Sequence, residues 1–281
     1  MDKIFVAGAG TMGLNIASVF ASYGMTVTVR DISEDIISAA DAKNRAKFEK
    51  LVSRGRLARD EAEAILSRMS FTTDVGAAKD AELVLEAVVE NMAVKKNVFR
   101  ELDEVCSPAA IFATNTSSKS VTELAASVSN PERFIGMHFF NPADRMELVE
   151  VIRGAQTSEE TFQAVFELAR AIGKDPIDVE EAPGFVVNRL LTPILNDAIQ
   201  MLYEGVASAE DIDKAMRLGA NHPMGPLELC DLVGLDVVLS VVDTLFDETR
   251  DPKYRACPLL RKMVRAGMLG RKTGRGFYEY K

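Results

Sequence analysis

The strongest constraint on the fold lies at the start of the sequence. Residues 3–7 (KIFVA) form a short apolar run, and the glycine pattern GAGTMG follows at 8–13. Helical periodicity then extends over 12–23, a second apolar run occupies 26–30, and Asp31 follows it. A G-x-G-x-x-G pattern between a strand and a helix, with an acidic residue after the next strand, is typical of a dinucleotide-binding βαβ unit.

Each residue type in the glycine pattern suits the binding of a dinucleotide. Gly8 allows a tight turn, Gly10 lets the backbone approach the pyrophosphate, and Gly13 allows the helix to pack closely on the strand. Thr11 and Met12 lie at the start of the helix, whose N-terminus would face the phosphates. We expect all five residues to contact or shape the cofactor site.

Asp31 indicates which dinucleotide the site prefers. Its carboxylate can accept hydrogen bonds from both ribose hydroxyls of NAD and would repel the 2′-phosphate of NADP. The neighbouring Arg30 would weaken this discrimination if it turned towards the ribose. We therefore expect NAD as the cofactor; the alternative is that three turn glycines and a surface aspartate occur here without a ligand.

Strands and helices continue to alternate after this unit. Strands are expected at 83–88, 111–115, 134–139, 148–152 and 177–179, and helices at 34–54, 59–68, 92–104 and 159–172. Alternation of this kind predicts a mostly parallel sheet with helices on both faces. After Pro183-Gly184 the segments are helical, at 185–204, 208–217, 225–247 and 257–267, until a final strand-like FYEY. We predict a Rossmann-type, doubly wound α/β domain over 1–183 and a smaller all-helical domain over 184–281.

The charge of the chain restricts its partners. The net charge is −9 and no block of Lys and Arg occurs, which argues against binding to nucleic acid or to an anionic membrane. A small local group of basic side chains can still bind the phosphates of a small molecule.

The cysteines and the apolar segments indicate a cytoplasmic protein. Cys106, Cys230 and Cys257 lie far apart without the spacing of metal ligands, so we expect reduced thiols and no metal site. The sequence enters a strand at once, which leaves no room for a targeting peptide. The longest apolar stretch, 224–246, contains several acidic residues and is expected to be a buried helical region instead of a membrane span.

The two histidines are the candidates for acid–base chemistry. Interconversion of an alcohol and a ketone by hydride transfer requires a group that takes up and returns the hydroxyl proton, and histidine suits this best. His138 stands near the end of a predicted strand, where doubly wound sheets bind their ligands. Glu150 lies on the next strand and could orient the imidazole and stabilise its protonated form. His222 precedes a proline and is expected at a helix start or an interface.

Motifs along nearly the whole chain make the sequence recognisable. They are GAGTMG at 8–13, EAVVENMAVKK at 86–96, TNTSS at 114–118, GMHFFNPADRMELVEV at 136–151, EAPGFVVNRLLTPILNDA at 181–198, NHPMGPLELCDLVGLD at 221–236 and GRKTGRGFYEY at 270–280. In these motifs the sequence resembles the 3-hydroxyacyl-CoA dehydrogenase family, particularly its short bacterial 3-hydroxybutyryl-CoA dehydrogenases.

The resemblance implies a reaction and the residues that carry it. The expected enzyme interconverts (S)-3-hydroxybutyryl-CoA and acetoacetyl-CoA with NAD(H), with His138 as general acid and base paired with Glu150. The resemblance further implies that Ser117 donates a hydrogen bond to the reacting oxygen and that the Asn188 amide binds the substrate. The alternatives are a turn or helix-cap residue for Ser117 and a helix-start residue for Asn188.

The resemblance also assigns residues to the cofactor site and to the phosphates of coenzyme A. It places Glu90, Lys95 and Asn115 in the cofactor site, the first two near the nicotinamide half; the alternative for Glu90 and Lys95 is a solvated pair at a helix start. Lys50 and Arg54 are one helical turn apart and are candidates for the phosphates of coenzyme A. A charged, solvated helix face is the alternative for that pair.

Other functions stay open at this point. One is a dehydrogenase of a free hydroxyacid or sugar acid, and another is a protein that binds NAD without turnover. The resemblance implies a place in fatty acid or butyrate metabolism. The apolar helices of the second domain are expected to be too exposed for a monomer, so we expect a homodimer through that domain.

Overall fold

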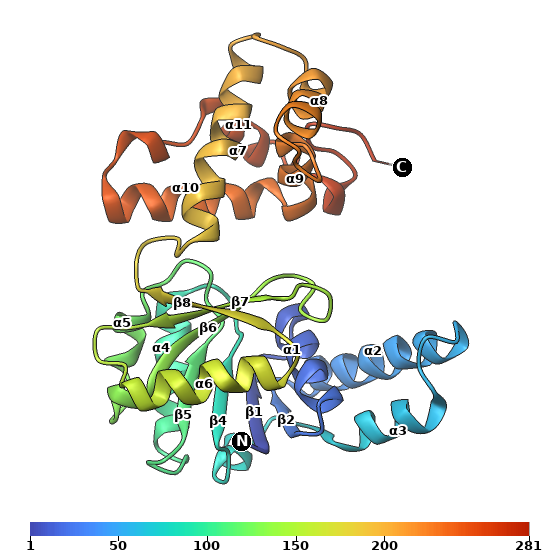
Figure 1. Cartoon of the computed structure of the whole chain (residues 1–281), viewed down its shortest axis with the longest axis vertical. Helices are drawn as coiled ribbons and strands as arrows, with labels where there is room; N and C mark the ends of the chain where they lie inside the picture. Colours follow the sequence, from blue (N-terminus) through green and yellow to red (C-terminus); the bar gives the residue numbers. More distant parts are fainter. Residues whose placement is uncertain (281) are drawn as a thin grey trace. The chain divides into compact units, whose positions relative to one another are not determined.

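The computed structural model describes residues 1–280 and divides into two compact units (Figure 1). The first unit is Met1–Ala182 and the second begins at Pro183. The first contains the sheet and the second is helical, so the predicted order of an α/β part and a helical part is confirmed.

The first unit is built on one eight-stranded sheet with the order β3-β2-β1-β4-β5-β6-β7-β8. All neighbouring pairs are parallel except β6 and β7, which are antiparallel. The prediction of a doubly wound, mostly parallel sheet is therefore confirmed. The strands are β1 (Lys3–Ala7), β2 (Thr26–Arg30), β3 (Met69–Thr72), β4 (Leu83–Glu86), β5 (Ile111–Thr114), β6 (Phe134–Phe139), β7 (Leu148–Arg153) and β8 (Asp175–Glu180).

Helices cover both faces of this sheet, as the drawing shows with α6 in front and α4 and α5 behind (Figure 1). On one face, Phe20 of α1 packs against Phe139 of β6. On the other, Phe99 of α4 packs against Phe112 and Phe134. Strands buried on both faces explain the nearly continuous apolar runs in the sequence. The helices are α1 (Thr11–Ser22), α2 (Glu34–Ser53), α3 (Arg59–Ser67), α4 (Met92–Asp103), α5 (Val121–Ala125) and α6 (Glu159–Ala171).

One strand and one α-helix of this unit were not expected from the sequence. Strand β3 lies at the edge of the sheet, and its sequence MSFT contains no continuous apolar run. Helix α5 is a short helix that starts at a Ser120 cap, whose hydroxyl accepts a hydrogen bond from Glu123 N. Elements this short give no periodicity to read.

The second unit packs its helices around a core of its own. The expected helix over 225–247 is two helices, because Gly234 has a φ of 103° and both ends α9 and begins α10. The expected strand at FYEY is wrong: this segment contributes one isolated bridge, between Glu279 and Arg275. The helices are α7 (Val187–Tyr203), α8 (Ala209–Gly219), α9 (Pro226–Val233), α10 (Leu235–Thr249) and α11 (Pro258–Arg265).

Two buried aspartates fix the C-terminal segment in this unit. Asp213 accepts hydrogen bonds from the backbone N–H groups of Leu227 and Glu228 and from the Tyr278 hydroxyl at 2.8 Å. Asp231 accepts from the backbone N–H groups of residues 277 and 278 and from the Tyr280 hydroxyl at 3.0 Å. The N–H groups of residues 277 and 278, which a strand could donate to a neighbouring strand, are thus bound to Asp231.

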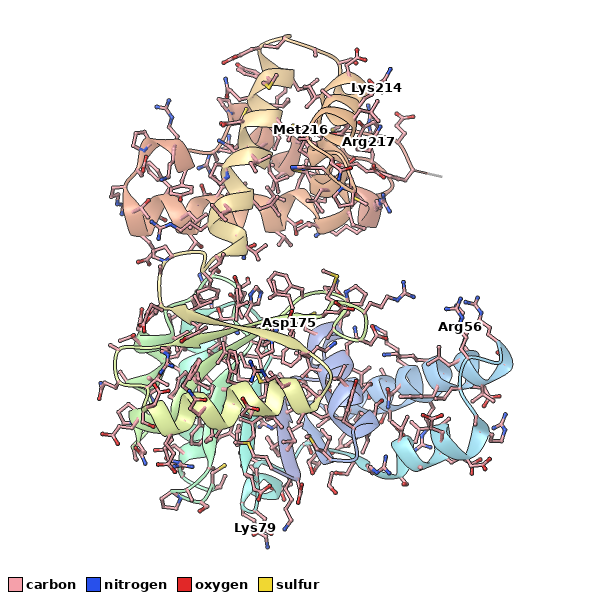
Figure 2. All side chains as sticks on the ribbon, viewed as in Figure 1. Arg56, Lys79, Asp175, Lys214, Met216 and Arg217 are labelled. Carbon is pink, nitrogen blue, oxygen red and sulfur yellow. The ribbon has the colours of Figure 1, made fainter. Side chains whose placement is uncertain are left out.

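The surface of α8 is charged. Lys214, Met216 and Arg217 lie along this helix (Figure 2), and the guanidinium of Arg217 is 3.7 Å from the carboxylate of Glu228. Among the helices described here, none has both the length and the apolar character needed to cross a membrane.

Candidate active site

The glycine loop after β1 has the backbone that its sequence requires. Gly8 has a φ of 110°, and a Cβ atom there would lie 2.6 Å from the carbonyl oxygen of Ala87. At Gly13 a Cβ would lie 1.9 Å from the carbonyl oxygen of Gly8. Gly10 ends the loop as the N-cap of α1, where no side chain caps the helix and a Cβ would meet no atom within 4 Å. Packing therefore requires two of the three glycines, and the third leaves open space at the helix N-terminus.

Asp31 is held beside this loop. Its Oδ2 accepts a hydrogen bond from Ala9 N at 2.7 Å, and its Oδ1 accepts one from Ile32 N at 2.8 Å. The guanidinium of Arg30 is engaged elsewhere: Nε donates to the carbonyl oxygen of Thr73 at 3.3 Å, and Nη2 lies 3.6 Å from Glu101. The Arg30 guanidinium is thus bound to Thr73 and Glu101.

His138 and Glu150 form a buried pair in the antiparallel part of the sheet. They are direct cross-strand partners on β6 and β7, and His138 Nδ1 lies 2.7 Å from Glu150 Oε2. Both side chains are buried. The ring of Phe140 lies beside the imidazole, with 4.6 Å between the ring centroids. A carboxylate at Nδ1 fixes the tautomer of the imidazole and stabilises its charged form.

Glu90 organises the turn that follows β5. Its Oε1 accepts hydrogen bonds from the Thr116 hydroxyl at 2.5 Å, from Ser117 N at 3.0 Å and from both the N–H and hydroxyl of Ser118. Burial alone would raise the pKa of Glu90, but Lys95 and the bonds from Thr116 and Ser117 outweigh burial and lower the pKa below its usual range. The turn carrying Ser117 is therefore built around an ionised carboxylate.

Lys95 is buried between two carboxylates. Its Nζ lies 2.7 Å from Glu86 Oε1 and 3.0 Å from Glu90 Oε2, and its side chain is 1% exposed. The alternative that Glu90 and Lys95 form a solvated pair at a helix start is therefore wrong. The signal that sequence reasoning missed is Glu86, an acidic residue inside the apolar run LVLEAV.

Asn115 joins the ends of three neighbouring strands. Its backbone N–H donates to the carbonyl oxygen of Glu86 on β4 at 2.8 Å. Its side-chain Oδ1 accepts from the N–H of Phe139 on β6 at 2.9 Å. Asn115 itself follows β5, so it links the end of β4, which carries Glu86, to the end of β6, which carries His138.

Family models match both parts of the chain. The NAD binding domain of 3-hydroxyacyl-CoA dehydrogenase matches residues 3–182, and the C-terminal domain of 3-hydroxyacyl-CoA dehydrogenase matches residues 184–280. The chain belongs to the 3-hydroxyacyl-CoA dehydrogenase family. The resemblance seen in the motifs is thereby confirmed, together with NAD as the cofactor and the activity class of an NAD-dependent dehydrogenase.

Similar proteins cover the chain from end to end. A 3-hydroxybutyryl-CoA dehydrogenase of Clostridioides difficile is 52% identical over 99% of both chains. The crystal structure of an (S)-3-hydroxybutyryl-CoA dehydrogenase from Ralstonia eutropha superposes with a TM-score of 0.96 at 45% identity, over 100% of this chain and 99% of that one. The crystal structure of FadB2 from M. tuberculosis gives 0.98 at 44% identity, with the same coverage.

Three further residues expected in the substrate site of this 3-hydroxyacyl-CoA dehydrogenase family member lie on α2 and α7. Lys50 lies in the last turn of α2 and Arg54 is its C-cap, and both are exposed. Within residues 1–280 neither takes part in a described salt bridge, so both basic groups remain candidates for a phosphate. Asn188 is the second residue of α7 in the other unit. Its role stays a prediction.

Proposed function

We propose that this chain oxidises (S)-3-hydroxybutyryl-CoA to acetoacetyl-CoA with NAD⁺ and catalyses the reverse reduction with NADH. The observation that carries the proposal is the buried His138–Glu150 pair, 2.7 Å apart, on the same sheet as the glycine loop and Asp31. An acid–base group beside a dinucleotide site is what hydride transfer to and from a secondary alcohol requires.

His138 is the residue to which we assign the proton transfer. During oxidation the imidazole Nε2 takes the proton of the 3-hydroxyl group as the hydride leaves C3, and bound NAD⁺ supplies the hydride acceptor. During reduction the imidazolium returns the proton to the forming alkoxide. Glu150 keeps the proton on Nδ1 and stabilises the imidazolium, as a carboxylate does in other acid–base pairs.

Two polar side chains complete the proposed substrate site. We assign to Ser117 a hydrogen bond to the reacting oxygen, and to the Asn188 amide a contact with the substrate. Glu90 supports the first assignment because it accepts hydrogen bonds from the backbone around Ser117 and so fixes the turn. Donors fixed in advance at a developing negative charge lower the barrier of the reaction.

Lys50 and Arg54 are the residues that we propose for the phosphates of coenzyme A. Both are exposed and basic at the C-terminal end of α2. A contact to a remote part of the substrate contributes to binding without changing in the transition state. We propose that 1–183 binds the cofactor and carries the substrate-binding residues named above other than Asn188, and that 184–281 adds Asn188 to the substrate site and forms the dimer.

The second unit also supports the proposal of a homodimer. Large apolar side chains of this unit are exposed, and a second copy of the chain could cover them; they include Leu190, Ile194, Met201, Val206, Leu218 and Leu232. Light scattering coupled to size exclusion would give the mass of a dimer.

The three free cysteines suit a reducing compartment, and we place the enzyme in the cytoplasm, in butyrate or fatty acid metabolism.

One assay separates this function from the alternatives. With NADH, the chain should reduce acetoacetyl-CoA and leave free acetoacetate almost untouched. Faster turnover of the free acid would favour a hydroxyacid dehydrogenase. Tight binding of NADH without turnover of either compound, measured by fluorescence, would favour a protein that binds NAD without catalysis.

A further inference from the structure

The order of the strands determines which groups lie beneath the reactive end of the cofactor. β1 carries the glycine loop for the pyrophosphate, β6 carries His138, and β4 and β5 lie between them. These four strands are parallel, so their carboxyl ends lie together along the same side of the sheet. If the proposed function holds, the nicotinamide must reach from the glycine loop to His138, and therefore lies over the ends of β4 and β5.

A cluster of three charged side chains, two of them almost fully buried, occupies this position. We call it the glutamate–lysine cluster: Glu86 at the end of β4, Glu90 in the loop after it, and Lys95 on α4. Lys95 Nζ bridges the two carboxylates at 2.7 and 3.0 Å. Glu86 and Lys95 are almost fully buried, whereas the side chain of Glu90 is 33% exposed.

The hydrogen bonds of Glu86 indicate that it is ionised. Oε1 accepts from Val88 N and from Lys95, each at 2.7 Å, and Oε2 accepts from the Thr114 hydroxyl at 2.7 Å. Thr114 Oγ1 in turn accepts from Thr116 N, so its proton points to Glu86. Both carboxylate oxygens therefore face donors only, and a protonated acid would place two hydrogens against each other.

Glu90 is ionised for a similar reason, because its Oε1 faces the backbone N–H groups of residues 117 and 118 and its Oε2 faces Lys95. Lys95, between two carboxylates, is an ammonium. The cluster thus holds two negative charges and one positive charge. One negative charge is in excess, and Glu86 and Lys95 are shielded from water.

We propose that this excess charge makes the enzyme discriminate between the two redox forms of its cofactor, with Glu86 as a specificity-determining residue. The nicotinamide ring is positively charged in NAD⁺ and neutral in NADH. A fixed negative charge near the ring therefore stabilises NAD⁺ and leaves NADH nearly unaffected. The proposal rests on the proposed function for the position of the ring, and goes beyond it in assigning a task to Glu86.

The size of the effect follows from the spacing of strands. Neighbouring strands are about 4.8 Å apart, so a ring over β4 and β5 lies within about 10 Å of the cluster. At that distance and an effective dielectric constant of about 20, one unit charge changes an affinity roughly tenfold. Because the effect acts on one redox form, it appears in the ratio of the two dissociation constants.

Three variants test the proposal in the absence of any acyl-CoA. Glu86→Gln and Glu90→Gln each remove one negative charge from a different member of the cluster, while Thr114→Val removes a hydrogen bond to Glu86 and no charge. NADH binding is followed by fluorescence, and NAD⁺ binding by displacement of NADH. We expect the ratio of the NAD⁺ to the NADH dissociation constant to rise roughly tenfold in both glutamine variants. In Thr114→Val the ratio of the two dissociation constants should stay within about twofold of its value in the wild-type protein.

The outcomes separate the inference from the proposed function. An unchanged ratio in Glu90→Gln, with a normal thermal unfolding curve, overturns the role of charge even where Glu86→Gln does not fold. A shift in Thr114→Val as large as in the glutamine variants overturns it as well, because geometry would then be the cause. If the unchanged protein binds neither NAD⁺ nor NADH, the proposed function itself fails.

Discussion

His138 Nδ1 lies 2.7 Å from Glu150 Oε2, and the two residues oppose each other directly across the antiparallel pair of β6 and β7. The pair is therefore positioned by the backbone ladder between β6 and β7 and does not depend on a loop. The two residues can be tested separately, because we assign the proton transfer to His138, and to Glu150 the orientation of the imidazole and the stabilisation of its charge.

Replacement of His138 should abolish most turnover and leave the cofactor site intact. In His138→Asn we expect kcat for acetoacetyl-CoA to fall by roughly 10²–10⁴-fold, since the variant has no group to exchange the proton. The dissociation constant of NADH should change little. His222→Asn is the matched control and should keep normal turnover. A kcat near normal in His138→Asn would remove this residue from the mechanism.

Glu150→Gln tests the charge at Nδ1 while keeping the size of the side chain. The amide cannot stabilise an imidazolium as a carboxylate does, so we expect kcat to fall by about 10²-fold or more at an unchanged NADH affinity. The exposed Glu147, in the loop between the same two strands, provides the control Glu147→Gln. Equal behaviour of the two variants in steady-state assays would contradict a role for Glu150.

Asp31→Ser should narrow the preference for NAD over NADP. The carboxylate accepts hydrogen bonds from Ala9 N and Ile32 N and would repel a 2′-phosphate, so its removal should lower KM for NADPH and raise it for NADH. The control is Asp80→Ser, next to Lys79 in the turn before β4 (Figure 2). A protein that already prefers NADPH before mutation would contradict the assignment.

The double variant Lys50→Ala, Arg54→Ala should weaken the binding of acetoacetyl-CoA. Exposed ionic contacts contribute about 1 kcal/mol or less each, so KM should rise roughly tenfold with kcat much less changed. A truncated thioester without the nucleotide should be affected hardly at all, and so should a Lys43→Ala control on the same helix. Equal losses on both substrates would mean that the pair supports the fold, and that the phosphates bind elsewhere.

The C-terminal segment should loosen at alkaline pH. Burial and the hydrogen bond to Asp231 raise the pKa of Tyr280 from 10.0 to about 12, and burial and Asp213 raise the pKa of Tyr278 as well. A folded-state pKa above the unfolded one means that the stabilisation is complete below pH 10 and is lost as the pH rises towards 12.

Guanidinium unfolding between pH 9 and about 12 measures this loss. The variant Tyr278→Phe, Tyr280→Phe should be less stable at pH 9 and should show a shallower decline of its unfolding free energy above pH 10. Tyr203→Phe, at an exposed position, is the control. A parallel decline in all three proteins would show that other groups cause the alkaline loss.

The parts of the fold that follow from the sequence are those with long, regular patterns. The run KIFVA, the glycine pattern and Asp31 predicted β1, α1 and β2 because each step has a local cause in backbone geometry. The edge strand β3 has no such pattern. Its four residues form a strand because they pair with β2, and the local sequence does not reveal that pairing. A Gly234 with a φ of 103° divides a helix whose apolar periodicity is unbroken in the sequence.

The same distinction holds in the site. The pairing of His138 with Glu150 could be predicted because adjacent strands bring them together. The burial of Lys95 could not, because a lysine near a helix start looks solvated unless its two carboxylate partners are known. Those partners lie on other elements, and Glu86 lies at the end of a strand whose other residues are apolar.

A shift of β7 by one residue against β6 would turn Glu150 to the opposite face of the sheet, since side chains alternate along a strand. The chain therefore has no intermediate register in which the pair is half made. A molecule in the shifted register would lack the carboxylate that stabilises the imidazolium and would turn over far more slowly, so slow heating should reduce the number of fully active molecules without slowing the others. Counting active sites during thermal inactivation would show fewer sites, each with undiminished turnover.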